Sequence, residues 1–235
     1  MVYDARTHVF EGWLLLLASE RKLCVGAVLL AAGAGSRLGN KPKSLLELDG
    51  VPLIHRQLAA LSGAGADEIV VVLGHYAAMI EAALAARSAP VNVKTVSNPK
   101  PDDGQPSSVR VGLQSLSATL DAVIVALADQ PLLNADDVIA LISAFKNRND
   151  AASMVVPRVL GEPGNPVIFD AALRDEWLRS DTNAMGRGWR EANPQRVQWF
   201  DSDNAHFRVD IDTAQDIKAF AQRTGRELRW PSGWV

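Results

Sequence analysis

The chain has 235 residues, of which 48% are hydrophobic and 22% are charged, and its formal net charge is −3. This length is enough to bury a substantial core, and the composition is ordinary for a globular protein. The small negative charge excludes a general affinity for nucleic acid. The single cysteine, Cys24, excludes an intramolecular disulfide and fits a reducing compartment such as the cytoplasm.

The first 22 residues contain one apolar run, at 13–18, which is too short to span a bilayer and follows no basic segment. We therefore expect no membrane association. We expect an N-terminal extension over 1–22, one folded domain over 23–225 and a C-terminal tail over 226–235, irregular from residue 230.

Apolar, β-branched runs alternate with segments of helical spacing along the chain. The predicted strands are 27–32, 69–73, 91–96, 122–127, 153–156, 166–169, 196–200 and 207–209. The predicted helices are 52–64, 77–86, 107–116, 135–148, 171–179, 183–192 and 214–223. This alternation predicts a single-domain, Rossmann-like α/β protein of three layers, with helices on both faces of a mostly parallel sheet.

The segment 28–46 reads as a buried strand that runs into a glycine-rich turn. Its glycines are Gly33, Gly35 and Gly39. Glycines let backbone N–H groups approach an anion, and the cations Arg37 and Lys43 can then hold the charge of a phosphate chain. The segment therefore indicates a nucleoside triphosphate site.

Other phosphate loops fit this segment less well. A dinucleotide fingerprint requires glycine where Leu38 stands, and a Walker A loop requires glycine where Pro42 precedes Lys43. The remaining alternative is an ordinary strand-to-helix turn with surface cations.

Three carboxylates follow predicted strands, where ligands of open parallel sheets bind. Asp129 is well placed to hold Mg²⁺ against phosphate oxygens, although it could also be a turn or capping residue. Asp210 and Asp212 alternate with apolar residues, so both project from one face of an extended segment. Asp212 and Thr213 also resemble a helix N-cap.

The segment 98–108 places small residues at the start of a predicted helix, where backbone N–H groups are free. Gly104, Ser107 and Ser108 suit the polar edge of a base or ribose. The alternative is a flexible loop with a serine cap.

Four segments together carry a family resemblance, and they are 29–54, 128–132, 161–169 and 210–217. In this order they resemble the signature of nucleotidyltransferases with the sugar-nucleotide pyrophosphorylase fold, the nucleotide-diphospho-sugar transferase type. They look most like the branch that contains the molybdenum cofactor cytidylyl- and guanylyltransferases. The resemblance covers about residues 26–222, which makes the domain over 23–225 an NTP transferase domain.

The resemblance implies a cytoplasmic, Mg²⁺-dependent enzyme that moves a nucleoside monophosphate from an NTP to a small phosphorylated acceptor and releases pyrophosphate. Molybdopterin cofactor is one such acceptor, and an enzyme that receives the product is a further expected partner. CTP is favoured over GTP, because the segments at Asp129 and Asp210 are cytidylyl-like.

The resemblance also assigns roles by motif position. Arg37 and Lys43 would stabilise charge on the triphosphate in the transition state. The metal ligands would be Asp129 and Asp212, with Asp210 as a further carboxylate. The nucleotide would be bound by Ala31, Ala32, Gly33, Gly35, Ser36, Gly104, Ser108 and Asp129.

One departure concerns the acceptor. The cytidylyltransferase branch often has Gly-Asp-x-Gly-Ala-Arg before its last strands, and residues 180–189 differ from that pattern. Three alternatives stay open: a non-catalytic nucleotide-binding accessory protein, a sugar-1-phosphate nucleotidyltransferase and a nicotinamide-dependent oxidoreductase. The missing third glycine of the dinucleotide fingerprint argues against the last of these.

Overall fold

The computed structural model describes residues 22–87, 92–180 and 185–233, so the predicted extension over 1–22 lies outside them except for its last residue. The main sheet has the strand order β10-β7-β9-β6-β1-β4-β5, and β8 pairs with β7. Its strands are β1 (Val25–Ala31), β4 (Glu68–Leu73), β5 (Val93–Ser97), β6 (Ala122–Leu127), β7 (Met154–Val159), β8 (Glu162–Pro163), β9 (Val167–Asp170) and β10 (Val197–Asp201).

Most neighbouring strands of this sheet are parallel. The exceptions are β9, which is antiparallel to both β6 and β7, and the short hairpin of β7 with β8. The helices are α2 (Leu53–Gly63), α3 (Ala77–Ala85), α4 (Gln105–Ser115), α5 (Ala135–Lys146), α6 (Ala171–Arg179), α7 (Arg187–Ala192) and α8 (Ala214–Thr224). The predicted fold class, a three-layer α/β protein with a mostly parallel sheet, is confirmed.

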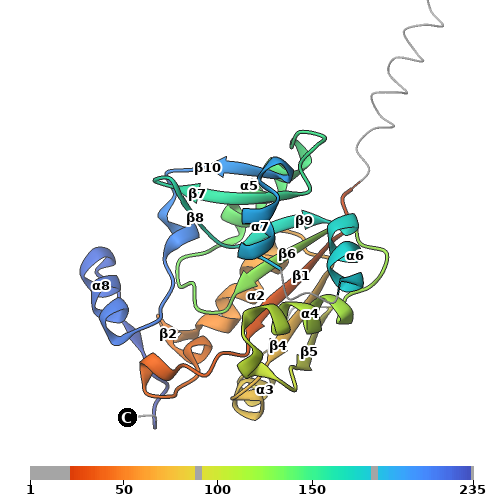
Figure 1. The fold of residues 1–235 in the computed structure, drawn as a ribbon. Helices are drawn as coiled ribbons and strands as arrows, with labels where there is room; N and C mark the ends of the chain where they lie inside the picture. The colour runs from red at the N-terminus through yellow and green to blue at the C-terminus, as the bar shows by residue number, and fades with distance from the viewer. Residues whose placement is uncertain (1–21, 88–91, 181–184, 234–235) are drawn as a thin grey trace, which may run out of the picture.

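The central strand β1 is buried along its whole length because helices cover both of its faces. Leu29 and its alternate neighbours pack with α2, α3 and α5, whereas Val28 and Leu30 pack with α4, α6 and α7. Gly112 lets α4 approach β1, since an added Cβ would lie 2.4 Å from Val28 Cγ1. Figure 1 shows the two helical layers and the sheet between them.

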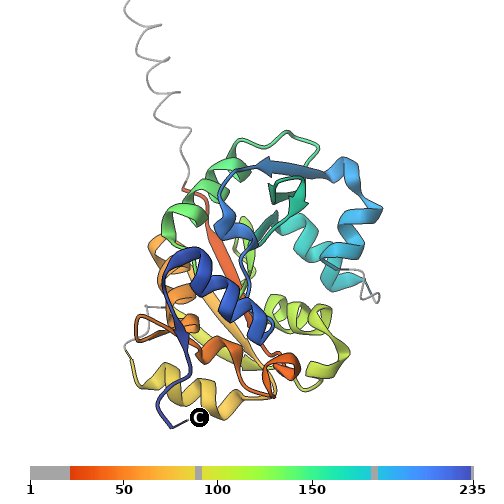
Figure 2. The same cartoon turned by 90° about the vertical axis from the view of Figure 1, so that its left-hand side faces the viewer.

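A small second sheet brings the end of the chain against the segment that follows β1. It has the order β11-β2-β3, from β2 (Glu47–Leu48), β3 (Val51–Pro52) and β11 (Leu228–Arg229). Phe220 of α8 is fully buried in a third apolar cluster with residues of this sheet. Figure 1 shows α8 beside β2 and apart from the other helices, and in Figure 2 this helix faces the viewer.

Two sequence predictions need correction. The predicted strand 207–209 is largely a 3-10 helix, η5 (Ala205–Arg208), because the side chain of Asn204 accepts a hydrogen bond from the His206 N–H and caps the turn. The predicted helix 183–192 begins in residues outside the described part, and α7 begins only at Arg187, after Gly186 with φ 60°.

The last part of the chain includes one short strand. β11 lies within the predicted tail over 226–235, although residues 230–233 are irregular and 234–235 lie outside the described residues. Among the helices that the structure describes, none has the length and apolar character needed to cross a membrane.

Candidate active site

β1 and β6 end side by side at a cavity in the surface of the domain. The two strands are parallel and in register, with Leu30 opposite Leu127, so the residues after both strands lie at one edge of the sheet. A cavity of about 490 Å³ opens at this edge. The predicted site residues that line it are Ala31, Ala32, Gly33, Arg37, Lys43, Gly104, Ser108, Asp129, Asp210 and Asp212.

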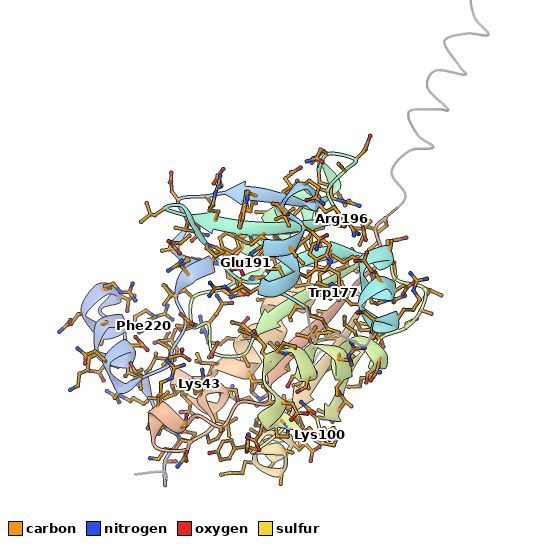
Figure 3. The ribbon with its side chains drawn as sticks, in the orientation of Figure 1. Lys43, Lys100, Trp177, Glu191, Arg196 and Phe220 are labelled. Carbon is orange, nitrogen blue, oxygen red and sulfur yellow. The ribbon has the colours of Figure 1, made fainter. Side chains whose placement is uncertain are left out.

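Lys43, which Figure 3 labels, lines this cavity and lies between two carboxylates. Its Nζ is 2.5 Å from Asp129 Oδ2 and 2.6 Å from Asp212 Oδ1. Burial alone would lower the pKa of Lys43, but the charges and hydrogen bonds of the two aspartates outweigh burial and raise it. Lys43 therefore carries a positive charge at neutral pH.

Arg37 supplies a second cation on the open side of the cavity. Its Nη2 lies 2.7 Å from Asp212 Oδ2, and its side chain is 67% exposed. Burial would raise the pKa of Asp212, but Lys43 and then Arg37 hold it below its ordinary value. Asp212 is thus an ionised carboxylate shared by two cations, and both cations are placed to bind phosphate oxygens instead.

The carboxylates retain acceptor capacity that the protein does not use. Asp129 Oδ1 is buried without a hydrogen-bond partner among the described residues. Burial, and then the negative charge of Asp129, raise the pKa of Asp210. Both features fit a divalent cation with oxygen ligands. Within 22–87, 92–180 and 185–233, however, no three His, Cys, Asp or Glu side chains form a complete metal site, so substrate or water oxygens would finish the coordination.

The chain segments that carry Asp129 and Asp212 are joined directly through the backbone. The Ile211 N–H donates to the Asp129 carbonyl oxygen at 3.1 Å. Thr213 caps α8, since its hydroxyl accepts from the Asp216 N–H at 3.2 Å while Asp216 Oδ2 accepts from the Asp212 N–H at 3.0 Å. The N-cap interpretation is therefore correct for Thr213, and it leaves the Asp212 side chain directed at Lys43.

Two predicted nucleotide-binding residues, Gly35 and Ser36, do not line the cavity. Gly35 shapes the turn, because its φ is 59° and an added Cβ would lie 2.0 Å from the Lys41 carbonyl oxygen. Its own carbonyl accepts from the N–H groups of Leu38 and Asn40. The tightness of this turn, and not a direct cavity contact, explains the glycine.

The opposite wall of the cavity is the start of α4, which Asn98 organises. Asn98 Nδ2 donates to Ser107 Oγ at 2.8 Å and to the buried Ser108 Oγ at 3.0 Å. Because Ser108 accepts this bond, its own hydroxyl proton is left to donate to a ligand. Gly104, with φ 88°, turns the chain into the helix. Asn98 was not predicted, since nothing in its sequence context marks it.

Two glutamines tie the site to the second half of the domain, and sequence reasoning missed both. Gln57 Nε2 donates to the Gln130 carbonyl at 2.5 Å. Gln130 Nε2 donates in turn to the carbonyls of Asn165 and Phe207 at 3.2 and 3.3 Å. Gln130 directly follows Asp129, so these bonds hold the carboxylate in place.

Comparison with known proteins places the chain in a family. Residues 27–197 match the model of the MobA-like NTP transferase domain. Nicotine blue oxidoreductase of Paenarthrobacter nicotinovorans is 33% identical over 199 residues, which cover 83% of this chain and 95% of that protein. The bifunctional protein GlmU of Sorangium cellulosum is 33% identical over 175 residues, which cover 72% of this chain but only 37% of GlmU.

Solved structures share the fold. Rv0371c from Mycobacterium tuberculosis has a TM-score of 0.71 at 24% identity, over 85% of this chain and 98% of that one, and it is also known in complex with manganese. Molybdopterin-guanine dinucleotide biosynthesis protein A from Archaeoglobus fulgidus has a TM-score of 0.62 at 16% identity, over 85% and 98%. With the family match, these findings confirm the resemblance to nucleotidyltransferases and, at the level of the family, the predicted enzyme class.

Proposed function

The chain belongs to the family of the MobA-like NTP transferase domain, and we propose that it moves a nucleoside monophosphate from an NTP to a small phosphorylated acceptor, with release of pyrophosphate. The observation that carries this proposal is the position of Lys43, which lies between Asp129 and Asp212 at the carboxyl ends of β1 and β6. A protein that only bound a nucleotide would not need a partly buried cation held between two carboxylates.

The cations act on the triphosphate. Arg37 and Lys43 would exchange their carboxylate partners for phosphate oxygens and stabilise the charge that develops on the leaving pyrophosphate. The acceptor phosphate would attack the α-phosphorus in line, so the chain needs to position two substrates and supplies no nucleophile of its own.

The carboxylates would hold a divalent cation, for which Mg²⁺ is our proposal. Asp129 and Asp212 would be the ligands, with Asp210 nearby, and the unpartnered Asp129 Oδ1 is the donor that fits this role best. When bound, such an ion neutralises phosphate charge and orients the α-phosphate. Lys43 contacts the same two carboxylates, and its role would be to bind phosphate oxygens of the substrate.

The base would lie against the start of α4, where Ser108 and Gly104 line the cavity. We propose CTP in preference to GTP, and an acceptor such as molybdopterin cofactor, from the resemblance of the motifs. A cytoplasmic location and a partner enzyme that receives the product complete the proposal.

A reductase is the second candidate. It is favoured by one observation, that the relative matched over 95% of its own length is named an oxidoreductase. This relative weakens the argument drawn from the missing third glycine. A non-catalytic accessory protein and a sugar-1-phosphate nucleotidyltransferase are the remaining alternatives.

Pyrophosphate release tests these candidates together. The protein is incubated with each of the four NTPs, Mg²⁺ or Mn²⁺, and a panel of phosphorylated acceptors, while NADH and NADPH oxidation is followed in parallel reactions. We expect release that requires both metal and acceptor and is fastest with CTP. NTP binding without release would favour the accessory protein, and nicotinamide oxidation without release would favour the reductase.

A further inference from the structure

A second cavity, of about 200 Å³, lies on the sheet face covered by α4, α6 and α7. Gln105 lines both this cavity and the one at Lys43, so the two are neighbours. The apolar part of its lining includes Val109, Val125, Met154, Val167, Phe169 and Trp177. The nucleotide site described above does not use any of these side chains.

Arg190 of α7 lines this cavity as a cation without a carboxylate partner among the described residues. Its guanidinium carbon lies 5.7 Å from the centroid of the Trp199 ring. Arg187, on the same helix, is 83% exposed and is paired with Glu191 at 2.7 Å. Burial lowers the pKa of Arg190, and the charge of Glu191 opposes this effect. A half-buried, unpaired guanidinium is costly, and an anion in the cavity would offset that cost.

Trp177 contributes a second unsatisfied polar group. The residue is 3% exposed, and its Nε1 has no hydrogen-bond partner within the described part of the chain. Its ring packs on Phe169 at a centroid distance of 4.7 Å and edge-on to Trp189 at 5.9 Å. Figure 3 shows Trp177 on the same side of the sheet as Glu191 of α7. The cavity therefore joins aromatic and aliphatic walls to an unpaired cation, and one of its wall residues, Trp177, carries a buried N–H without a partner among the described residues.

We propose that this second cavity holds the body of the acceptor, and that the acceptor is a flat, largely apolar phosphate ester with a second anionic group that pairs with Arg190. This inference rests on the proposed function, because it assigns the phosphate of the acceptor to the cavity at Lys43 and its ring system to the neighbouring one. A sugar phosphate fits less well, since most of its hydroxyl groups would lose water against the apolar walls, and the polar lining is limited to side chains such as Gln105, Asn165 and Arg190.

Binding of small probes tests the inference without any turnover. The probes are 1-naphthyl phosphate, the phosphate ester of 3-hydroxy-2-naphthoic acid, which adds a carboxylate, and glucose 1-phosphate. Each is titrated calorimetrically into the wild type, Arg190→Gln and Arg179→Gln. Arg179 is a matched control, because it lies at the exposed end of α6 and does not line the cavity.

We expect both naphthyl probes to bind the wild type more tightly than glucose 1-phosphate. Arg190→Gln should weaken binding of the carboxylated probe about tenfold, which is the value of a charge-assisted hydrogen bond, and change the uncarboxylated one little. Arg179→Gln should bind like the wild type. Equal binding of glucose 1-phosphate, or unchanged binding of the carboxylated probe by Arg190→Gln, would overturn the proposal.

Failure of the proposed function gives a different pattern. If the naphthyl probes bind through Arg190 but never accept a nucleotide from CTP, while another acceptor does, the cavity is a binding site and its acceptor role is wrong. If no acceptor supports pyrophosphate release, nucleotidyl transfer itself is wrong.

Discussion

Lys43 Nζ donates a hydrogen bond to Asp212 Oδ1 at 2.6 Å, across 169 positions of the chain. The contact depends on the C-terminal part of the domain, because β11 pairs with β2 just beyond Lys43 and Ile211 bonds to the Asp129 backbone. The site is therefore assembled from segments that lie near both ends of the folded domain.

Lys43→Ala should remove most of the catalytic rate while the protein stays folded. The loss of one preorganised charge-stabilising donor costs about 10²–10³ in rate, and the cavity at Lys43 is large enough to admit water in its place. Arg37→Ala should act in the same direction. The measurement is pyrophosphate release, with circular dichroism as the check on folding.

Lys41→Ala is the matched control for Lys43→Ala. Lys41 lies on the same loop, with its Nζ 5.3 Å from the centroid of the Trp230 ring, and it does not line the cavity. It should retain near wild-type turnover. A Lys43→Ala enzyme that turns over as fast as Lys41→Ala would refute the assignment of the phosphate site.

Removal of divalent metal should abolish turnover, and Mg²⁺ or Mn²⁺ should restore it. Asp129→Asn and Asp212→Asn should each raise the metal concentration needed for half-maximal activity, since each removes a charged oxygen ligand. Asp136→Asn, in the first turn of α5 and outside the cavity, should not. Full activity in EDTA would exclude the metal from the mechanism.

The base preference can be measured without an acceptor. Because Ser108 and Gly104 line the cavity at the start of α4, we expect Ser108→Ala to weaken nucleotide binding, and we expect CTP to bind the wild type more tightly than GTP, ATP or UTP. Calorimetric titration with the four nucleotides checks both. Tighter binding of GTP would reverse the preference and leave the reaction class unchanged.

The sequence pattern was sufficient to predict the individual buried strands and the residues that follow them. Apolar runs marked β1 and β6 with their ends, and the rule that ligands bind beyond strand ends brought Asp129 close to Lys43. The antiparallel direction of β9 and the pairing of β11 with β2 depend on tertiary contacts, which leave no periodic signal. Asn98 was missed for the same reason, because its role comes from hydrogen bonds to residues nine and ten positions away.

The hydrogen bonds of Glu176 should make a pH-dependent contribution to stability. Its carboxylate accepts from Arg196 Nη1 at 2.8 Å and from Trp189 Nε1 at 3.1 Å. Burial would raise the pKa of Glu176, but the bonds to Arg196 and Trp189 lower it below the ordinary 4.5. A lowered pKa stabilises the folded state above the unfolded-state pKa, and this contribution is lost as the pH falls through the folded-state value.

Glu176→Gln should therefore be less stable than the wild type at pH 7, by less than about 1 kcal/mol because the side chain is partly exposed. The difference should close as the pH falls below the ordinary pKa of 4.5 and through the lowered folded-state pKa. Thermal unfolding of both proteins across this range is the measurement. Glu81→Gln, on the exposed side of α3, is the control and should show no pH-dependent difference. A gap that widens in acid would contradict the assignment.

The last prediction separates two glycines of the phosphate turn. Gly35 and Gly39 both have positive φ, at 59° and 72°, so alanine is strained at either position. An added Cβ at Gly39 would meet no atom within 4 Å, whereas at Gly35 it would lie 2.0 Å from the backbone oxygen of Lys41. Gly39→Ala should thus lower the free energy of unfolding by only about 1 kcal/mol, the strain of an alanine in the left-handed backbone conformation. Gly35→Ala must also displace the loop that carries Lys43. It should therefore lower the free energy of unfolding by more than about 2 kcal/mol and slow turnover. Urea unfolding of the two variants gives the comparison, and equal losses would mean that the turn relaxes freely and that Gly35 has no special role in placing Lys43.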